Sequence, residues 1–358
     1  MKELRILNIV MAKVWGGGEQ YVYDTSKALN KNGCKVYIAV DKGNIAMQKR
    51  FAEAGIVIGC SLYSIAGMKS IYKLSKLIKK EKIDIINCHS GHAMILCLLL
   101  KFITGVKLVS FKHNAIPAKF DWYHKWQRQH TDAFICVSKL VYDIQIEGLN
   151  EQIKRKFHLV YNGIDLEKFN KYKGNFFEKD KFIVGYAGRI AANKGIDILV
   201  QAFAKLSKKY PDMYLYLAGS DEKGYMNKLQ AMIVSYQLEK KVKFLGQVQD
   251  MEKFYKSINL FILPSVVKEA FGLVLCEAMY CGVPVITTDS GAQREIIDDS
   301  VDGYIVKAGS VEELAEKINH EINIKCTNVN CNKIIQLFSI DHCTDNLLMI
   351  YKNLIKNN

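Results

Sequence analysis

The chain has 358 residues, of which 49% are apolar and 24% are charged, with a formal net charge of +14. This composition is typical of folded globular proteins and excludes a disordered chain, while the length suits two domains of about 150 residues each. The charge is uneven, because residues 1–170 hold 26 Lys and Arg against 14 Asp and Glu, whereas residues 171–358 hold 24 against 22. A basic first half indicates either an ordinary solvated surface or an anionic partner such as a membrane, a nucleic acid or a phosphorylated substrate.

Neither a membrane span nor a disulfide framework is predicted. The longest apolar run, 93–100, is far shorter than the roughly 18 residues that cross a bilayer, and the first apolar run is too short for a signal peptide. Ten cysteines without framework spacing favour a reducing cytoplasm. Three cysteines and a histidine cluster late in the chain without the tight pairs of zinc sites, so no metal site is expected: Cys326, Cys331, His342 and Cys343.

Apolar strand-like segments alternate with helical ones in the first half. The expected strands are 3–12, 34–41, 82–89, 106–113 and 132–138. A glycine-rich loop follows the first of them and leads into a helix through 23–32 that ends at Gly33. Strands that alternate with helices predict a parallel sheet with helices on both faces.

The same alternation starts again after the polar, glycine-containing segment 160–175. The second set of expected strands is 181–189, 213–220, 241–246, 258–265 and 282–289, with a helix over 194–210. Two such series predict two Rossmann-like domains, which we place at 1–166 and 167–339. The remaining segment carries helical apolar spacing and is expected to dock as a final helix at about 340–358.

Ligands of parallel sheets bind beyond the carboxyl ends of the strands, and Gly16–Gly18 follow the first expected strand. Glycines there let backbone amides approach a phosphate at the helix N-terminus. A dinucleotide fingerprint needs a third glycine where the chain has Tyr21, so NAD binding is disfavoured even though Asp41 could serve as the ribose-binding acid. Contact with a phosphate or sugar and a ligand-free turn remain the two interpretations.

Two cations follow the first strand of the second series. Arg189 and Lys194 lie in a short loop before a helix. The planar fork of an arginine and the point charge of a lysine together suit a diphosphate, although two loop cations can equally be surface charges.

Glu269 and Glu277 stand eight residues apart, the second among apolar neighbours. A helix is expected to start near Phe271 and Gly272, so the amides of Ala270, Phe271 and Gly272 would form an anion site. The carboxylate of Glu277 can accept two hydrogen bonds from a vicinal diol such as ribose, and that of Glu269 can accept from a second sugar. Pairing of Glu277 with a neighbouring helix or lysine is the alternative.

Eight motifs then run nearly from end to end: GGGEQY (16–21), IDIINCHS (83–90), FICVS (134–138), VYNGID (160–165), GR-x4-KG (188–195), EAFGLVLCEAM (269–279), GVPVITTDSGAQREII (282–297) and DGYIV (302–306). With these motifs the chain resembles retaining glycosyltransferases of family 4, the glycosyl transferases group 1. The resemblance implies the α/β GT-B fold, in which two Rossmann-like domains face each other across a deep cleft and the C-terminal helix crosses back to the first domain. It also implies that the first domain binds the acceptor and the second the nucleotide sugar.

The resemblance assigns roles to single residues. Glu277 corresponds to the glutamate that holds the nucleotide ribose and Glu269 to the one that holds the donor sugar. Arg189 and Lys194 correspond to the pair that binds the donor diphosphate, and His89, or His92 in a shifted register, corresponds to a histidine that faces the donor sugar. Further donor contacts are implied at the glycine loop and the helix start: Gly17, Gly18, Ala270, Phe271, Gly272 and Leu273.

The acceptor is expected to bind the first domain through Glu19, Gln20, His113 and Asn114. Many family members read GG-A-E-R where this chain reads Gly18-Glu19-Gln20, which suggests that an arginine for phosphate or acceptor is missing. A lysine-rich amphipathic helix and an aromatic–cationic segment suit contact with an anionic membrane, at about 1 kcal/mol per basic residue near the surface, and an ordinary exposed surface explains them as well: 68–82 and 113–130.

The resemblance therefore implies a retaining enzyme that moves a hexose from a nucleotide diphosphate sugar, with UDP as the default. The acceptor would be a glycan or a lipid-linked saccharide, such as a lipopolysaccharide core or another cell-envelope saccharide. Attack would occur on the face from which the nucleotide leaves, with a phosphate oxygen taking the proton. The sequence has no Asp-x-Asp pair, so neither a metal nor another cofactor is expected.

The expected location is the cytoplasm, with peripheral contact at the inner face of the membrane. No nucleic-acid motif accompanies the basic charge, so no nucleic-acid partner is expected. Two alternative enzymes remain at this stage, beside a catalytically inactive sugar-binding homologue. One is a nucleotide-sugar 2-epimerase of the same fold, and the less favoured one is an NAD-dependent dehydrogenase.

Overall fold

The computed structural model describes residues 3–62, 67–176, 180–301, 303–324, 329 and 331–356. The chain divides into two compact units. Unit 1 comprises Met1–Gly163 together with Ile340–Asn358, and unit 2 comprises Ile164–Ser339. Two residues of the sequence interpretation, Cys326 of the cysteine cluster and Asp302 of the DGYIV motif, lie outside the described residues.

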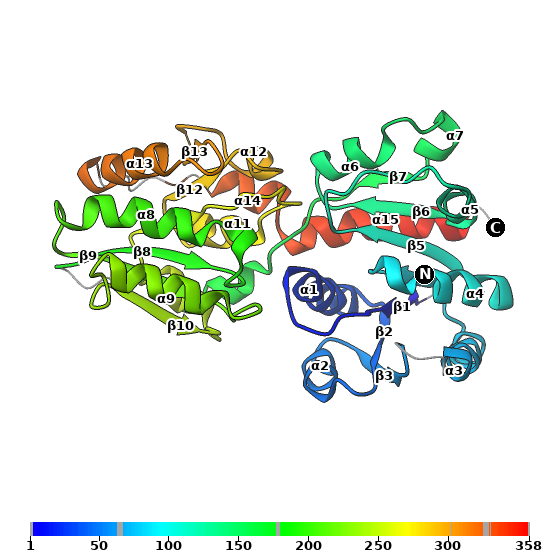
Figure 1. Ribbon diagram of the computed structural model, residues 1–358. Coiled ribbons are helices and arrows are strands. Elements are labelled where there is room, and N and C mark those ends of the chain that lie inside the picture. The colour runs from blue at the N-terminus through cyan, green and yellow to red at the C-terminus, as the bar shows by residue number, and fades with distance from the viewer. Residues whose placement is uncertain are drawn as a thin grey trace. The chain divides into compact units, whose positions relative to one another are not determined.

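Unit 1 alternates strands and helices along the chain and receives one helix from the far end of the sequence (Figure 1). Its strands are β1 (Arg5–Ile9), β2 (Lys35–Asp41), β3 (Ile56–Cys60), β4 (Ile85–Cys88), β5 (Lys107–Lys112), β6 (Ala133–Cys136) and β7 (Phe157–Leu159). Its helices are α1 (Gly17–Lys31), α2 (Ile45–Phe51), α3 (Gly67–Glu81), η1 (Gly91–Ala93), α4 (Met94–Thr104), α5 (Trp122–His130), α6 (Lys139–Ile146), α7 (Glu151–Lys154) and α15 (Ile340–Lys356).

Unit 2 repeats the alternation. Its strands are β8 (Phe182–Ala187), β9 (Met213–Ala218), β10 (Val242–Gly246), β11 (Leu260–Leu263), β12 (Val285–Thr288) and β13 (Tyr304–Val306). Its helices are η2 (Leu166–Phe169), η3 (Ala192–Lys194), α8 (Ile196–Ser207), α9 (Tyr225–Ser235), α10 (Met251–Tyr255), α11 (Leu273–Tyr280), α12 (Gln293–Ile296), α13 (Val311–Ile324) and α14 (Asn332–Leu337).

Both sheets are parallel, as the alternation predicts. The described residues of unit 1 form a sheet with the order β3-β2-β1-β4-β5-β6-β7, and those of unit 2 form one with the order β10-β9-β8-β11-β12-β13. The strand order reverses between β1 and β4 in unit 1, and between β8 and β11 in unit 2. In open parallel sheets such reversals mark the edge where ligands bind, beyond the carboxyl ends of the two strands.

Successive residues of the central strands enter separate cores, which shows that helices cover both faces of the sheet in unit 1. Ile6 packs in one core with side chains of α1, α2 and α15, whereas the next residue, Leu7, packs in another with side chains of α3 and α4. A strand buried on both faces explains the near-continuous apolar runs from which the strands were predicted.

Helix α15 packs against α1 in unit 1, and Figure 1 shows this red helix among the blue-to-teal elements of that unit. Its buried face includes Cys343, Leu347, Ile350 and Tyr351. The Tyr351 hydroxyl accepts a hydrogen bond of 2.8 Å from Asn87 of β4. The predicted return of the final helix to the first domain is therefore confirmed. No helix within the described residues has the length and apolarity that a membrane span requires.

Candidate active site

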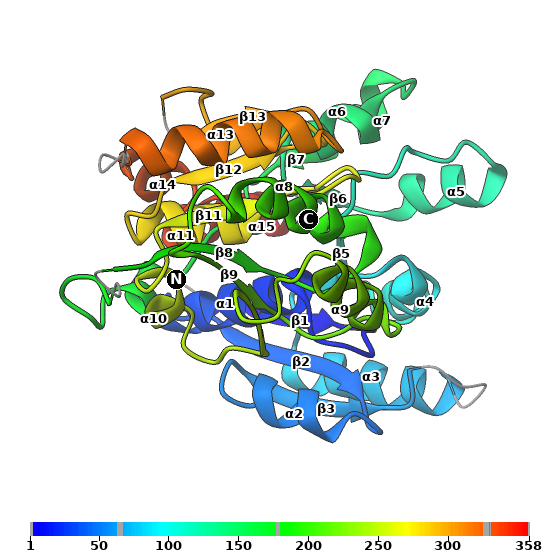
Figure 2. The same ribbon diagram turned by 60° about the vertical axis from the view of Figure 1, so that its left-hand side comes forward.

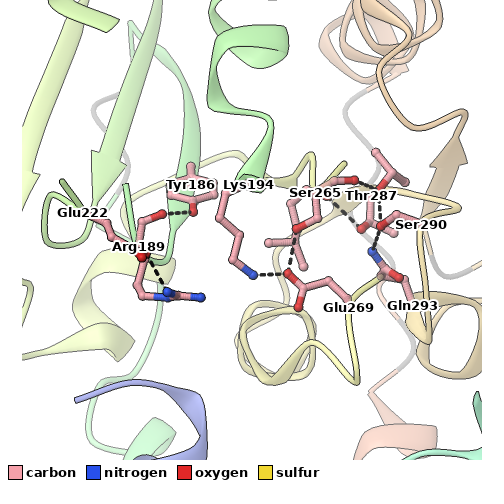
Figure 3. A network of polar contacts seen from close by, with 11 residues as sticks. Tyr186, Arg189, Lys194, Glu222, Ser265, Glu269, Thr287, Ser290 and Gln293 are labelled. Atoms are coloured by element: carbon pink, nitrogen blue, oxygen red, sulfur yellow. Dashed lines mark hydrogen bonds and ion pairs between the residues drawn. The ribbon is translucent and has the colours of Figure 1, made fainter. Parts of the chain in front are cut away.

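The loops that follow β8 and β11 carry three charged residues that were predicted to bind the donor. Arg189 and Lys194 lie in the loop after β8, and Glu269 lies in the loop after β11. Because β8 and β11 are hydrogen-bonded neighbours at the reversal of strand order, the two loops meet at one edge of the sheet (Figure 3).

Lys194 and Glu269 form an ion pair between the Lys194 ammonium and Glu269 Oε1, and each side chain is 16% exposed. The hydroxyl of Ser265 donates a second hydrogen bond to the same carboxylate oxygen at 2.7 Å. Ser265 is itself held in place, because its carbonyl accepts a hydrogen bond of 2.6 Å from Thr288 Oγ1. The carboxylate of Glu269 is thus oriented by a cation and by a hydroxyl that are both fixed.

Gly195 explains how Lys194 reaches this position. It adopts a left-handed conformation with φ +65°, and a Cβ added to it would lie 2.0 Å from the carbonyl oxygen of Pro264 at the end of β11. Only glycine permits such an approach of one backbone to another. Gly195, the second glycine of the GR-x4-KG motif, therefore lets the loop of Lys194 pack against the loop of Glu269.

Arg189 lies at the same sheet edge but has a different partner. Its Nη1 donates to Glu222 Oε2 at 2.6 Å, with the two side chains 45% and 35% exposed. Its carbonyl accepts a hydrogen bond of 2.8 Å from the Tyr186 hydroxyl, which fixes the backbone (Figure 3). An exposed ion pair contributes about 0–1 kcal/mol, so the guanidinium can exchange Glu222 for a phosphate at little cost.

Helix α11 begins at Leu273, and its N-cap is Gly272 at φ +118°. The predicted donor contacts Ala270 and Phe271 thus precede the helix, close to the expected start. Glu277 lies inside α11, is only partly buried, and accepts a hydrogen bond of 2.7 Å at Oε2 from the Tyr255 hydroxyl. Burial, and then the neighbouring Glu277 carboxylate, raise the pKa of Tyr255, so this hydroxyl remains a donor.

In unit 1, His89 lies at the corresponding sheet edge, beyond the ends of β1 and β4. The amide of His89, directly after β4, donates to the carbonyl of Ile9 at the end of β1 at 3.4 Å. A Cβ added at Gly17 or Gly18 would meet no atom within 4 Å, so packing does not require glycine at either position. Glu19, a predicted acceptor contact, accepts a hydrogen bond of 2.9 Å from the Gly16 amide and caps α1.

Gln20, the second predicted acceptor contact, is held by its neighbours. Its amide oxygen accepts from Trp15 Nε1 at 3.2 Å and from Arg50 Nη2 at 3.0 Å, and its amide nitrogen donates to Asp24 at 2.9 Å. Arg50 also stacks on Trp15, 3.7 Å from the ring centroid. The sequence interpretation did not identify Arg50, which brings a cation next to the residue where family members have arginine. No local pattern signals this contact, since 30 positions separate the two residues.

His89 and His113, which follow the neighbouring strands β4 and β5, form a hydrogen-bonded pair. Asn8 Oδ1 accepts from Asn87 Nδ2 at 2.9 Å and lies 3.1 Å from His89 Nε2, so this nitrogen carries the proton. His89 Nδ1 therefore accepts from His113 Nε2 at 3.1 Å. Burial lowers the pKa of His89 and lowers that of His113 to about 4, so both rings are neutral near pH 7. Asn114 is exposed beside them and His92 is exposed in η1.

Comparison with known proteins identifies the family of the chain. The model of Glycosyltransferase Family 4 matches residues 15–168, and that of Glycosyl transferases group 1 matches residues 167–336. Together the matches cover residues 15–336, which include all the described strands except β1. The chain belongs to glycosyltransferase family 4.

Relatives of this family 4 enzyme include two bacterial glycosyltransferases. The Escherichia coli UDP-Gal:alpha-D-GlcNAc-diphosphoundecaprenol alpha-1,3-galactosyltransferase is 27% identical over 321 residues, which cover 82% of this chain and 81% of the relative. The capsular polysaccharide biosynthesis glycosyltransferase CapM of Staphylococcus aureus is 28% identical over 287 residues, which cover 72% of each.

Solved structures of glycosyltransferases share the fold. A glycosyltransferase from Rickettsia africae superposes with a TM-score of 0.87 at 23% identity over the whole of both chains. Anabaena HepE, solved with UDP and glucose, superposes with a TM-score of 0.82 at 21% identity, covering 98% of this chain and all of HepE. The fold of this family 4 glycosyltransferase is GT-B.

Proposed function

We propose that this glycosyltransferase is a retaining hexosyltransferase that uses a UDP-sugar and acts on a saccharide of the cell envelope, either lipid-linked or part of a glycan. The observation that carries the proposal is the Lys194–Glu269 pair at the strand reversal of unit 2, in the motif positions of the family. The choice of UDP is supported by relatives whose names specify UDP-Gal, or UDP and glucose. The choice of acceptor class is supported by relatives named for undecaprenol-linked, capsular and lipopolysaccharide substrates.

Each donor residue has a role that its surroundings suit. Lys194 and Arg189 neutralise the diphosphate, and Arg189 leaves its exposed partner Glu222 to do so. Glu269 accepts hydrogen bonds from hydroxyls of the donor sugar, and Ser265 keeps its carboxylate in one orientation. Glu277 accepts from the ribose diol while the Tyr255 hydroxyl holds its other side.

In this proposal the reaction proceeds on one face of the donor sugar. The acceptor hydroxyl attacks the anomeric carbon on the side from which UDP leaves, and an oxygen of the departing phosphate takes the hydroxyl proton. Charge develops on the diphosphate in the transition state, so Lys194 and Arg189 supply electrostatic stabilisation there. The chemistry uses these two cations in place of a metal, so transfer should persist in EDTA.

Variants of the three charged residues test the assignment. Lys194→Ala, Arg189→Ala and Glu269→Ala should each lower kcat at least about 100-fold, because each removes a preorganised group that contacts the reacting donor. Lys205→Ala is the matched control, since it breaks an exposed ion pair with Glu312 in the same unit. Transfer at near-normal rates by any two of the three variants would disprove the site.

Product analysis tests the reaction class. Nuclear magnetic resonance of the product should show the anomeric configuration of the donor retained in the new glycosidic bond, whereas inversion would refute the retaining mechanism. Release of a free sugar epimer in place of a glycoside would identify the 2-epimerase alternative.

Calorimetry with UDP, GDP, ADP and NAD tests which nucleotide the protein binds. Weaker binding of UDP by Glu277→Ala than by the wild type would support the ribose contact.

We also propose that unit 1 contacts an anionic membrane through α3 and α4, which pack against each other. Helix α3 exposes lysines along its length: Lys69, Lys73, Lys76, Lys79 and Lys80. Helix α4 exposes four large apolar side chains on one stripe: Ile95, Leu99, Phe102 and Ile103. Exposed apolar side chains beside basic ones suit the interface of a bilayer with anionic lipids, where each lysine contributes about 1 kcal/mol.

Vesicle flotation tests this contact. The protein should float with vesicles that contain phosphatidylglycerol and should not float with pure phosphatidylcholine. The double variant Ile95→Ser, Phe102→Ser should bind at least about tenfold more weakly, whereas Val234→Ser, an exposed apolar position on α9 of unit 2, should bind like the wild type. Equal binding by the double variant and the wild type would exclude α4 as the contact.

A further inference from the structure

Unit 1 contains a cavity of about 190 Å³ between the end of β5, the segment 113–121 and helix α5. The segment and α5 lie at the edge of the unit, as Figure 2 shows. The side chains that matter for its chemistry are Lys112, His113, Asn114, Lys119, Arg128 and Phe134. At about 30 Å³ per water molecule the cavity has room for several waters, or for a small ligand group in their place.

Two cations of this cavity are shielded from water and form no ion pair among the described residues. Arg128 is only 8% exposed, and its Nη1 donates to the Lys119 carbonyl at 2.8 Å. Lys112 is partly buried, and its Nζ lies 5.1 Å from the centroid of the Phe134 ring. Across the described ranges of the chain, neither side chain makes an ion pair.

Asp121 acts on Arg128 and offsets only part of the effect of burial on its pKa. Asp121 is half exposed and forms an ion pair of 2.6 Å with His124. No carboxylate is among the described residues that line the cavity. The two histidines at its inner end, His89 and His113, are neutral and add no negative charge.

Removing two like charges from water costs free energy unless an opposite charge compensates them. Burial lowers the pKa of Lys112, against the smaller opposing effects of Cys88 and Cys136, and Arg128 lowers it further. Burial also lowers the pKa of Arg128, and Asp121 offsets this only in part. An anion in the cavity would remove this cost. An arginine fork beside a lysine is the combination that phosphate oxygens prefer.

We propose that this cavity binds a phosphate or diphosphate group carried by the acceptor, an inference that rests on the proposed glycosyltransferase function and extends it to the acceptor. Large exposed apolar side chains occur in the same part of the chain: Ile116, which lines the cavity, is 57% exposed, and Phe120 and Trp122 are 47% and 78% exposed. The Arg128 guanidinium lies 5.5 Å from the Phe120 ring centroid. A phosphate in the cavity would therefore have apolar surface beside it, where a lipid chain attached to that phosphate can lie.

Isothermal titration calorimetry with sodium pyrophosphate, on the full chain with saturating UDP, tests the proposal. The UDP occupies the proposed donor site, so pyrophosphate reports on the cavity. Lys112→Met should weaken pyrophosphate binding at least about tenfold, whereas Lys112→Arg, which keeps the charge, should retain most of it. Lys125→Met is the matched control, because Lys125 is exposed on α5 outside the cavity and should leave the affinity unchanged.

Farnesyl diphosphate and farnesol distinguish the source of the phosphate. Tighter binding of farnesyl diphosphate than of pyrophosphate assigns the cavity to a lipid-linked acceptor, and equal binding assigns it to a soluble phosphorylated one. Farnesol that binds as tightly as farnesyl diphosphate, or pyrophosphate that binds Lys112→Met like the wild type, overturns the proposal.

The same titrations separate this proposal from the proposed function. UDP is titrated first, into the wild type and into Lys112→Met. Absence of UDP binding to the wild type would refute the donor assignment alone, since the comparison of Lys112→Met with Lys125→Met does not depend on it. Normal UDP binding by Lys112→Met would show that unit 2 is intact in the variant.

Discussion

Gly291 and Glu269 approach each other backbone to backbone. A Cβ added at Gly291 would lie 2.3 Å from the carbonyl oxygen of Glu269 and 2.5 Å from its nitrogen. The next residue, Ala292, donates its amide to the Glu269 carbonyl at 2.9 Å. The segment after β12 thus holds the backbone of Glu269, while Ser265 and Lys194 hold its carboxylate.

Gly291→Ala should therefore displace Glu269 without touching the donor. We expect kcat to fall about 10- to 100-fold, because a shift of about 1 Å at a reacting group can cost 100-fold, and stability to fall by about 1–3 kcal/mol from overpacking. Steady-state kinetics and urea unfolding measure the two effects. Gly91→Ala is the control, since a Cβ there meets no atom within 4 Å. Unchanged kcat in Gly291→Ala would show that this contact does not position Glu269.

Glu222→Gln should strengthen UDP binding. In the structure Arg189 Nη1 donates a hydrogen bond of 2.6 Å to Glu222 Oε2. An exposed ion pair of this kind contributes about 0–1 kcal/mol to stability. Removal of the competing carboxylate should lower the Kd of UDP by up to about fivefold in calorimetry at low salt. A weaker affinity for UDP in this variant would mean that Glu222 positions Arg189 instead of competing for it.

Tyr255→Phe should weaken donor binding, because Tyr255 holds the carboxylate of Glu277. The Tyr255 hydroxyl donates to Glu277 Oε2 at 2.7 Å, so its loss leaves the carboxylate without one of its fixed partners. We expect the KM for the donor to rise about 3- to 10-fold with little change in kcat, because the ribose contact is the same in the ground and transition states. If kcat fell instead of KM rising, Glu277 would act on the reacting sugar and not on the ribose.

The His89–His113 pair should make unit 1 less stable in mild acid. The pKa of His113 is about 4 in the folded protein, below its usual 6.5, so the unfolded chain binds more protons between these values. The free energy of unfolding should thus change little above pH 7 and fall by about 2 kcal/mol between pH 7 and pH 5. The lowered pKa of His89 should add to this fall.

Urea unfolding of His113→Gln at the two pH values measures this contribution. The variant should lose most of the difference between pH 7 and pH 5, whereas His92→Gln, at an exposed position in η1, should keep the wild-type difference. The same pH dependence in the wild type and in His113→Gln would contradict a neutral buried His113.

The sequence predicted all the central strands and one edge strand, β10. Strands buried on both faces must be continuously apolar, and each of these segments is found in the sheets. The three strands without a prediction, β3, β7 and β13, all lie at sheet edges. β7 and β13 have only three residues each, and β3 is buried at one residue of five, so none of them forms a long buried apolar run.

The site is predictable only where its residues share a motif. Arg189, Lys194, Glu269 and Glu277 occupy fixed spacings near strand ends, so the parallel sheet alone brings the two loops together. Arg50 reaches Gln20 from helix α2, and Arg128 reaches the cavity from helix α5. Contacts between helices and distant loops depend on packing that no local pattern encodes.

Helix α15 also affects the order of folding during synthesis. Residues of unit 2 are translated before α15, so this unit can close while unit 1 still lacks the helix that covers Tyr21, Val22 and Cys34. Domains usually fold as units in the order in which they are made. Here the part made first must wait for the part made last, so its apolar surface stays open to chaperones until α15 has been synthesised.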